Sequence, residues 1–331
     1  MGATDLEEES QPGRRASEQP HQQEAGKQEE FIVRFWGVRG SYPVSTTTTL
    51  GIGGNTSCVE VQAGGHEIIL DAGTGLIALG RALNRRLAGS SLSTTLLFSH
   101  LHYDHILGLP FFEPLYQAGS RLHLAGPRMA GKSFAHSLHA AFTSPYFPVD
   151  LRDVPSACQF STLDVGATLE WYADQQEPVL WVAETSAMPA NAQEVPQGTL
   201  RVNCLYTSAH PRNGCLVFRI EYAGRSLVYA TDLEGGTESD EAFIRFASGA
   251  DLLIHDAQYT EEDYRASKRG FGHSTVQMAA NNAHLAGVKQ LLLFHHDPEH
   301  DDATLERLCQ EARLRFPETA LASEGLEMKL I

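Results

Sequence analysis

The segment "FSHLHYDHILGLP", from Phe98 to Pro110, constrains this chain more than any other part of its sequence. It places His100, His102, Asp104 and His105 within six residues, directly after the apolar run "TTLLF". Such a run is typical of a buried strand, and residues two apart after it can point their rings the same way. Neutral imidazoles and carboxylates suit Zn²⁺, Mn²⁺ or Fe²⁺. We therefore expect a metal site here, the alternative being a chance cluster of surface histidines.

Three further polar residues end apolar runs elsewhere in the chain. His210 ends "CLYTSAH", Asp232 ends "SLVYATD", and His295 ends "QLLLFH". Taken singly, each has a simpler explanation, because a buried histidine can be satisfied by hydrogen bonds and an aspartate can cap a helix or turn. Together with the histidine cluster, they predict a centre for two metal ions on one rim of a sheet sandwich.

The net charge bears on which partners the protein can bind, and the cysteine content bears on the cellular compartment in which it resides. A formal net charge of -16 disfavours nucleic acid as a partner, since phosphate attraction needs basic side chains. The five cysteines are scattered and form no CxxC pair, which favours reduced thiols and a cytoplasmic location. No run approaches the roughly 18 apolar residues of a membrane span, so we expect no membrane contact.

Residue composition along the chain divides it into an expected tail and one expected domain. Residues 1–29 are polar, acidic and almost free of large apolar residues, which predicts a disordered acidic tail. Residues 30–331 form one domain, in which 144–197 is expected to be a less regular insertion because it is rich in Pro, Gln and Ala. Strands and helices alternate through both halves of this domain, which favours a layered α+β sandwich. The expected strands fall within 31–41, 57–63, 67–75, 121–126, 201–209, 215–232, 250–259 and 289–296, and the expected helices within 76–87, 128–142, 274–287 and 302–316.

The metal motif has the form H-x-H-x-D-H, and in this it resembles the metallo-β-lactamase superfamily. "LDAGTG" at Leu70, "HPRNGCLVFRIE", "YATD" and "LLLFHHDP" follow in the order of that family. The resemblance implies a four-layer αβ/βα sandwich that holds two divalent ions, Zn, Mn or Fe. It implies that His100, His102 and His210 hold one ion, that Asp104, His105 and His295 hold the other, and that Asp232 bridges them. His296 is the alternative to its neighbour His295.

Two later segments narrow the branch of this family. "ADLLIHDAQY" and "GFGHSTVQMAANNAHLAGVKQLLLFHH" resemble ribonuclease Z and its phosphodiesterase relatives, in which an acidic residue pairs with the histidine of a Gly-His-Ser-Thr motif. The corresponding residues here are Asp256 and His273. The resemblance implies phosphodiester hydrolysis, with a hydroxide oriented by Asp104 and Asp232 and with His273 as the proton donor. "GHST" is also typical of a helix N-cap, and both interpretations can hold.

Departures from ribonuclease Z shape the expected substrate. The acidic partner is Asp256 rather than the usual Glu, and no long Gly/Pro-rich basic arm is present. With the negative charge, this favours hydrolysis of a small phosphodiester over maturation of transfer RNA. The segments "FWGVRGS", "GGNTSCVEV" and "HHDP" resemble those of bacterial cyclic-nucleotide phosphodiesterases, which implies cyclic nucleotides as the main substrates. The 144–197 segment can cover the metal mouth or form a dimer contact, and we expect a homodimer. The alternatives are a ribonuclease Z-like endonuclease acting at RNA 3′ ends, a non-phosphoryl metallo-hydrolase, and a metal-bound sensor without turnover.

Two smaller features stay open. Tyr146 and Phe147, in "TSPYFPVDLRDVP", can stack on a base, although core packing is the more ordinary role for aromatic residues. "GGNTS" at Gly53 can place backbone N–H groups near a phosphate or simply form a tight turn.

Overall fold

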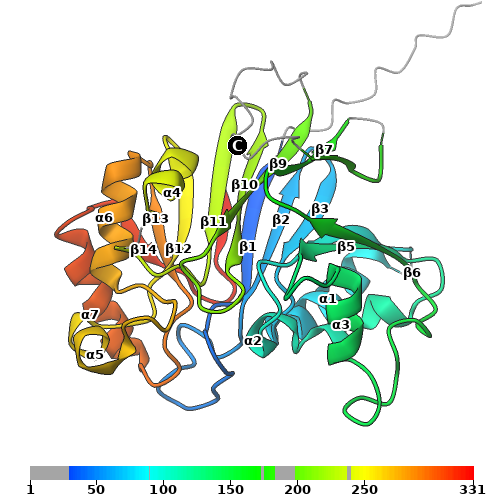
Figure 1. Cartoon of the computed structure of the whole chain (residues 1–331), viewed down its shortest axis with the longest axis horizontal. Coiled ribbons are helices and arrows are strands. Elements are labelled where there is room, and N and C mark those ends of the chain that lie inside the picture. The colour runs from blue at the N-terminus through cyan, green and yellow to red at the C-terminus, as the bar shows by residue number, and fades with distance from the viewer. Residues whose placement is uncertain (1–29, 89, 173–174, 183–197, 237–239) are drawn as a thin grey trace, which may run out of the picture.

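Two mixed β-sheets pack face to face, and helices cover the outer face of each sheet (Figure 1). The computed structural model describes residues 30–88, 90–172, 175–182, 198–236 and 240–331, so the expected acidic tail lies outside the described residues. This arrangement confirms the α+β sandwich with its helix–sheet–sheet–helix layers.

The first sheet holds the strands of the N-terminal half of the domain, with the C-terminal strand at one edge. Its strand order is β15-β1-β2-β3-β4-β5-β6, antiparallel from β15 to β3 and parallel from β3 to β6. The strands are β1 (Phe31–Gly37), β2 (Cys58–Ala63), β3 (His66–Leu70), β4 (Ser93–Leu97), β5 (Arg121–Pro127), β6 (Ala157–Leu163) and β15 (Glu327–Lys329).

The second sheet holds most of the C-terminal half. Its order is β14-β13-β12-β11-β10-β9-β7-β8, with β11 to β14 parallel and the other pairs antiparallel. The strands are β7 (Ala167–Trp171), β8 (Val179–Val182), β9 (Leu200–Thr207), β10 (Cys215–Tyr222), β11 (Arg225–Ala230), β12 (Leu252–Asp256), β13 (Leu291–Phe294) and β14 (Thr319–Leu321). Ala223 and Gly224, both with positive φ, close the hairpin between β10 and β11, so the expected strand range 215–232 holds two strands.

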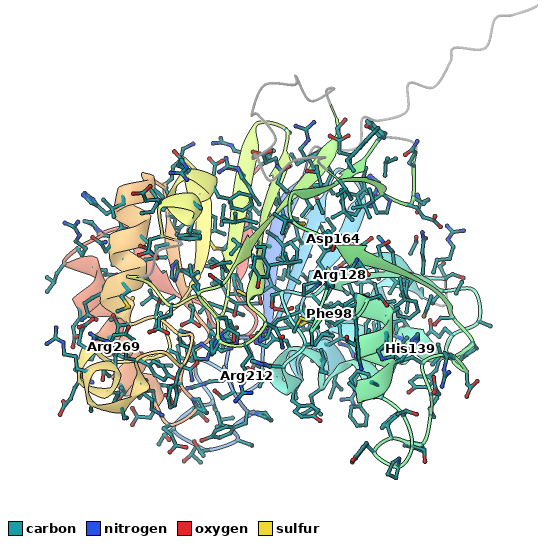
Figure 2. All side chains as sticks on the ribbon, viewed as in Figure 1. Phe98, Arg128, His139, Asp164, Arg212 and Arg269 are labelled. Atoms are coloured by element: carbon teal, nitrogen blue, oxygen red, sulfur yellow. The ribbon has the colours of Figure 1, made fainter. Side chains whose placement is uncertain are left out.

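Helices pack on the outer faces of the sheets through two apolar clusters, one for each sheet. The helical segments are α1 (Gly75–Leu87), α2 (Tyr103–Ile106), η1 (Leu109–Phe111), η2 (Glu113–Tyr116), α3 (Phe134–Ala141), α4 (Asp240–Ala247), α5 (Glu261–Asp263), η3 (Tyr264–Lys268), α6 (Val276–Ala286) and α7 (Asp302–Arg313). The helices α1 and α3 cover the first sheet. Phe98, which is labelled in Figure 2, packs there on Phe134 of α3 with ring centroids 5.2 Å apart. The helices α4, α6 and α7 cover the second sheet.

The core between the sheets joins the two halves of the domain. Phe35 of β1 lies 6.2 Å from Phe294 of β13, measured between ring centroids, and both side chains are fully buried. Burying one such side chain stabilises the fold by about 1.5–3 kcal/mol. These contacts join strands that lie far apart in the sequence, one in each half of the chain.

The expected insertion over 144–197 needs correction. Residues 157–163 form β6 at the edge of the first sheet, and 167–171 and 179–182 form β7 and β8 of the second. The sequence obscures these strands because β6 and β8 are edge strands with partly exposed side chains, and because β7 carries Glu170, which forms an ion pair with Arg201 at 2.6 Å. Residues 183–197 lie outside the described residues.

Candidate metal centre

The predicted ligands meet where strands of both sheets end. His100, Asp104 and His105 follow β4, with the last two turned inward by the short helix α2, and all three are buried. From the second sheet, His210 follows β9 and His295 follows β13. Ends of parallel strands are the ordinary place for ligand sites in such sheets, because helix starts and loops converge there.

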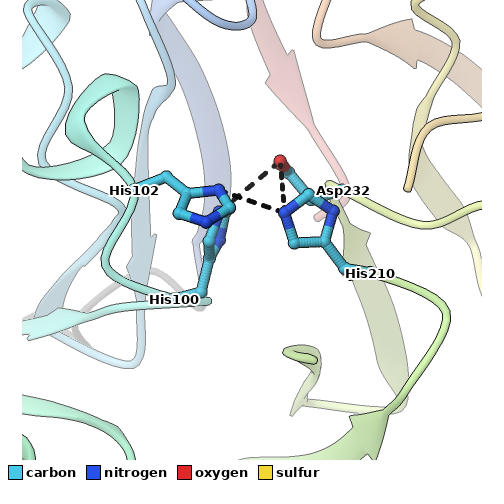
Figure 3. A group of neighbouring side chains, drawn as sticks. All are labelled: His100, His102, His210 and Asp232. Carbon is cyan, nitrogen blue, oxygen red and sulfur yellow. Dashed lines mark hydrogen bonds and ion pairs between the residues drawn. The ribbon is translucent and has the colours of Figure 1, made fainter. Parts of the chain in front are cut away.

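His100, His102 and His210 form a first group with Asp232, which follows β11 (Figure 3). The Oδ1 atom of Asp232 lies 3.6 Å from Nε2 of His100 and 3.8 Å from Nε2 of His210. The Nε2 atom of His210 lies 3.1 Å from Nδ1 of His102. The Nε2 atom of His100 is buried and has no hydrogen-bond partner, which is costly for a polar atom unless a cation takes that place.

A second group is made by Asp104, His105, Asp232 and His295. The Oδ2 atom of Asp232 lies 3.1 Å from Nε2 of His105 and 3.2 Å from Nε2 of His295. The Oδ2 atom of Asp104 lies 3.3 Å and 3.2 Å from the same two nitrogens, which are 3.3 Å apart. Four atoms held about 2.0–2.1 Å from one tetrahedral ion lie about 3.3 Å from one another. The donor set thus has the spacing that a divalent cation requires.

The two oxygens of Asp232 face different groups. Oδ1 faces His100 and His210, whereas Oδ2 faces His105 and His295. This carboxylate could therefore bridge two ions. His295 belongs to the group and His296 does not, because Nε2 of His296 hydrogen-bonds to the carbonyl of Ala322 at 3.0 Å.

Outer hydrogen bonds orient these imidazoles. The Nδ1 atom of His105 lies 2.8 Å from Oδ2 of Asp71, and that of His210 lies 3.2 Å from the carbonyl of Gly272. The Nδ1 atom of His295 lies 3.1 Å from Oε1 of Gln258. When Nδ1 carries the proton for such an acceptor, the lone pair of Nε2 faces the centre, which is the arrangement that metal-binding histidines need.

Sequence reasoning did not assign these supporting residues. Asp71 lies in the "LDAGTG" segment. Besides facing His105, its carboxylate accepts hydrogen bonds from Ser99 and, at 2.8 Å, from the hydroxyl of Tyr229. The backbone N–H of Ser41 donates to Oδ2 of Asp104 at 2.7 Å. The one available signal was the position of Asp71 at the end of an apolar run, the same signal that identified Asp232.

Charge states in the first group favour a cation. Burial lowers the pKa of His100, His102 and His210, so these rings are neutral and keep a free lone pair. Burial raises the pKa of Asp232, but His295, His105 and His100 outweigh burial and hold that pKa well below its usual range. The first group therefore offers neutral nitrogens beside an ionised carboxylate.

The second group concentrates negative charge around His105. Burial lowers the pKa of His105, but Asp232, Asp104 and Asp71 outweigh burial and raise that pKa well above its ordinary value. A pocket that stabilises a proton on a buried ring in this way would also attract a divalent cation.

His273 and Asp256 form a buried pair beside the two groups. The Nδ1 atom of His273 lies 2.7 Å from Oδ2 of Asp256, and its ring stacks on that of His295 with centroids 4.9 Å apart. Burial lowers the pKa of His273, but Asp256 outweighs it and raises the pKa to about 9. The helix-cap interpretation of "GHST" also holds, because Thr275 caps α6 by accepting from the N–H of Met278.

A cavity of about 450 Å³ opens onto this centre. It is lined by Ser41, Leu101, His102, Tyr103, Asp104, Ile106, Ala141, Asp232 and His273. The segment "GGNTS" contributes no residue to this lining. The backbone N–H of Asn55, in that segment, bonds to the carboxylate of Glu324 at 2.6 Å, which supports a structural turn.

None of the helices among the described residues combines the length and the apolar character that a membrane span needs.

Comparison with known proteins places this fold and site in a family. The model of the Beta-lactamase superfamily domain matches residues 66–296. A ribonuclease Z of Brevibacillus brevis is 27% identical over 318 residues, covering 89% of this chain and 95% of the relative. A ribonuclease Z of Synechococcus sp. (strain CC9605) is 30% identical over 264 residues, covering 70% of this chain and 78% of the relative.

Solved structures share the fold. The metallo-β-lactamase fold protein YhfI from Bacillus subtilis matches with a TM-score of 0.60 at 20% identity, covering 91% of this chain and 100% of that one. The short form of human tRNase Z matches with a TM-score of 0.57 at 21% identity, covering 90% of this chain and 98% of that one. The chain therefore belongs to the metallo-β-lactamase superfamily, in its ribonuclease Z-like branch, and is a metal-dependent phosphodiester hydrolase.

Proposed function

We propose that this protein is a two-metal endonuclease that cleaves RNA near its 3′ end. The observation that carries the proposal is the position of Asp232, whose two oxygens face two separate ligand groups beside the His273–Asp256 pair. Curated relatives that match most of this chain are named ribonuclease Z, and this supports RNA as the substrate. This proposal favours the RNA endonuclease over the cyclic-nucleotide enzyme that the sequence analysis expected.

The residues would divide the work as follows. His100, His102 and His210 would hold one ion, Asp104, His105 and His295 the other, and Asp232 both. Zn²⁺ or Mn²⁺ suits these nitrogen and oxygen donors. Such ions supply hydroxide near neutral pH and neutralise charge on a phosphoryl oxygen.

The protein would supply the leaving-group proton. His273 lines the cavity, and Asp256, with smaller contributions from Asp232 and Asp104, raises its pKa to about 9. It can therefore donate its Nε2 proton to the departing oxygen, while Asp256 keeps Nδ1 engaged and fixes the ring.

Composition supports a second candidate function, the hydrolysis of cyclic nucleotides. The net charge of -16 opposes a polyanion. In addition, β10 and β11 are joined by only Ala223 and Gly224, so no basic arm extends from this hairpin.

A substrate panel separates the two candidates. The protein, loaded with Mn²⁺ or Zn²⁺, is assayed on precursor transfer RNA, cyclic mononucleotides, cyclic dinucleotides and bis(p-nitrophenyl) phosphate. We expect cleavage of the RNA at a single 3′ position, and loss of that cleavage in Asp232→Asn and His102→Ala. Glu241→Gln on the exposed surface of α4 serves as the control. Turnover of cyclic nucleotides without RNA cleavage would favour the second candidate, and metal binding without turnover would favour a sensor.

A further inference from the structure

Tyr103 stands between two of the candidate ligands, yet its side chain is exposed. It separates His102 from Asp104, lines the cavity, and has 72% of its surface open to solvent. Its hydroxyl makes no hydrogen bond within the part of the chain that the structure describes. A large aromatic ring at the wall of a charged cavity is poorly explained by core packing, because it contributes little buried area.

Other exposed apolar side chains continue from Tyr103 at helical spacing. Leu107 and Phe111 follow at steps of four residues, with 38% and 50% of their surfaces exposed. The backbone passes from α2 through a turn into the 3-10 helix η1, since the N–H of Leu107 bonds to the carbonyl of Tyr103 and that of Phe111 to the carbonyl of Gly108. Tyr103 and Leu107 are four residues apart on the turn of α2 and lie on one face of it, and Phe111 ends η1. The three exposed side chains thus form a stripe along two short helical segments that begin at the cavity.

The stripe is extended by the loop after α3. The rings of Phe111 and Phe147 meet edge to face with centroids 5.7 Å apart, and the adjacent Tyr146 is 85% exposed. This exposure rules out core packing for Tyr146. In Figure 1 the loop after α3 projects at the end of the molecule where α2 lies. We call Tyr103, Leu107, Phe111, Tyr146 and Phe147 together the apolar strip.

An exposed cation follows one of the candidate ligands in the chain. Arg212 comes two residues after His210, is exposed, and forms no ion pair among the described residues. Figure 2 shows Arg212 in the lower centre of the molecule. In a chain with a net charge of -16, a free guanidinium beside a candidate metal ligand favours an anionic substrate at this opening.

We propose that the apolar strip is a stacking surface for unpaired bases of an RNA strand whose scissile phosphate lies at the metal centre. Continuity identifies the occupant, because the strip begins at a residue between two candidate ligands and runs outward along the surface. Every base has a face that can stack on an aromatic ring, so such a surface binds a single strand without reading its sequence. The strip extends beyond the cavity, whereas a cyclic mononucleotide would use only Tyr103. The inference rests on the proposed function for the identity of the strand and adds where that strand lies.

Binding and cleavage of a short RNA test this separately. A fluorescein-labelled single-stranded RNA is titrated against the Mn²⁺-loaded protein by anisotropy, and cleavage of the same RNA is followed on gels. We expect Tyr103→Ala to weaken binding by about tenfold or more, the effect of losing one stacked base. The loss in cleavage should appear in KM rather than kcat. Tyr103→Phe should restore binding because it keeps the ring, and Tyr146→Ala should weaken binding to a smaller extent.

Two controls make the result specific. Trp181→Ala removes an exposed aromatic side chain from β8, an edge strand outside the strip, and should leave binding as in the wild type. An RNA that carries abasic sites should bind the wild type as weakly as ordinary RNA binds Tyr103→Ala, and the two losses should not add.

The outcomes distinguish the inference from the proposed function. RNA that binds through Tyr103 but is not cleaved would support the strip and overturn the endonuclease. Cleavage with equal affinity in the wild type and Tyr103→Ala would overturn the strip and leave the endonuclease standing. Loss of the metal from Tyr103→Ala would also overturn the strip, because the residue would then act through its neighbours His102 and Asp104.

Discussion

At the scale of single residues, the centre depends on conformations that most side chains avoid. Asp71, Asp232 and His295 all have positive φ, at 57°, 53° and 59°. Aspartate and histidine adopt the left-handed region more often than most residues, but each such residue still costs about 1–3 kcal/mol. Each lies just after a strand, where the turn aims its side chain across the gap between the sheets. The hydrogen bonds and ion pairs of these residues offset the strain locally.

His273 carries the first prediction at this scale. Replacing His273 with alanine should leave both ligand groups intact, because His273 contributes to neither the His100 group nor the Asp104 group. We expect two bound metal ions per chain by elemental analysis, as in the wild type. Turnover of an RNA or a generic phosphodiester should fall by about 10²–10⁴, the usual contribution of a positioned proton donor. A variant that loses metal would show that His273 is a ligand, as its place in a third group with Asp256 and His295 allows.

His123 carries a prediction about pH and stability, well away from the chemistry. It is buried on β5, where its Nε2 lies 2.8 Å from the hydroxyl of Ser161, and burial lowers its pKa to about 4. The unfolded chain therefore binds a proton that the folded chain excludes between about pH 6.5 and pH 4. Stability should fall as the pH drops below about 6.5, by at most about 1.4 kcal/mol per pH unit from this residue.

The comparison with His123→Gln isolates this effect, since glutamine keeps a hydrogen-bonding group but does not titrate in this range. Urea unfolding at pH 7 and pH 5 should show the wild type losing on the order of 1–2 kcal/mol more than the variant. Loss of metal at acid pH affects both proteins and cancels in the comparison. Equal losses in the two proteins would contradict a neutral, buried His123.

At the scale of elements, the sequence indicated most of the strands and helices because their apolar periods are clear. The strands β1 to β5 and β9 to β13 fall within or beside the expected ranges, and α6 and α7 begin at Thr275 and Asp301 caps. The edge strands β6, β8, β14 and β15 were missed, since side chains at an edge are half-exposed and follow no strict alternation. The helix expected over 128–142 begins only at Phe134, after Ala130 and Gly131 with positive φ.

The same limit applies to the candidate site. Residues that end apolar runs, such as His210 and Asp232, could be found because burial of the preceding strand leaves a periodic signal. Supporting residues such as Glu234 and Gln258 could not, because their role depends on contacts between segments that are distant in sequence. Glu234, for example, contacts Gly270 and Gly272 across 36 and 38 residues.

Glu234 gives a prediction for these two segments. Its buried carboxylate accepts from the hydroxyl of Tyr264 and the N–H of Gly270, both at 2.7 Å, and from the N–H of Gly272 at 2.9 Å. The carbonyl of Gly272 in turn faces Nδ1 of His210. Glu234→Gln places an amide N–H₂ against a backbone N–H, which should loosen this loop. We expect metal affinity to fall by about 10–100-fold, as for other residues that orient ligands, with the fold retained.

Isothermal titration with Zn²⁺ and far-ultraviolet circular dichroism check both parts of this expectation. Glu241→Gln is the matched control, because it makes the same change on α4 at a carboxylate exposed to solvent. Unchanged metal affinity in Glu234→Gln would mean that the loop holds His210 without this carboxylate.

At the scale of the whole molecule, the centre joins the two sheets. Each ligand group takes side chains from both halves: His100 and His102 from the first sheet, and His210 and Asp232 from the second. The second group likewise combines Asp104 and His105 with Asp232 and His295. Without cations, the neutral imidazoles of the first group and the carboxylates of Asp104 and Asp232 would face one another across this gap. Metal binding should therefore stabilise the contact between the halves as well as the site.

Chelation tests this coupling. An ion that binds the folded chain stabilises it by about 4 kcal/mol when its free concentration is a thousand times its Kd. For a domain of this size, removal of the metal should lower the Tm by on the order of 5 °C, and addition of Zn²⁺ or Mn²⁺ should restore it. Scanning calorimetry with and without chelator measures the shift. Asp232→Asn should begin with a lower Tm and lose less on chelation, because it lacks the carboxylate shared by both groups. Equal Tm values with and without metal would show that the inter-sheet core, with Phe35 and Phe294, holds the halves together unaided.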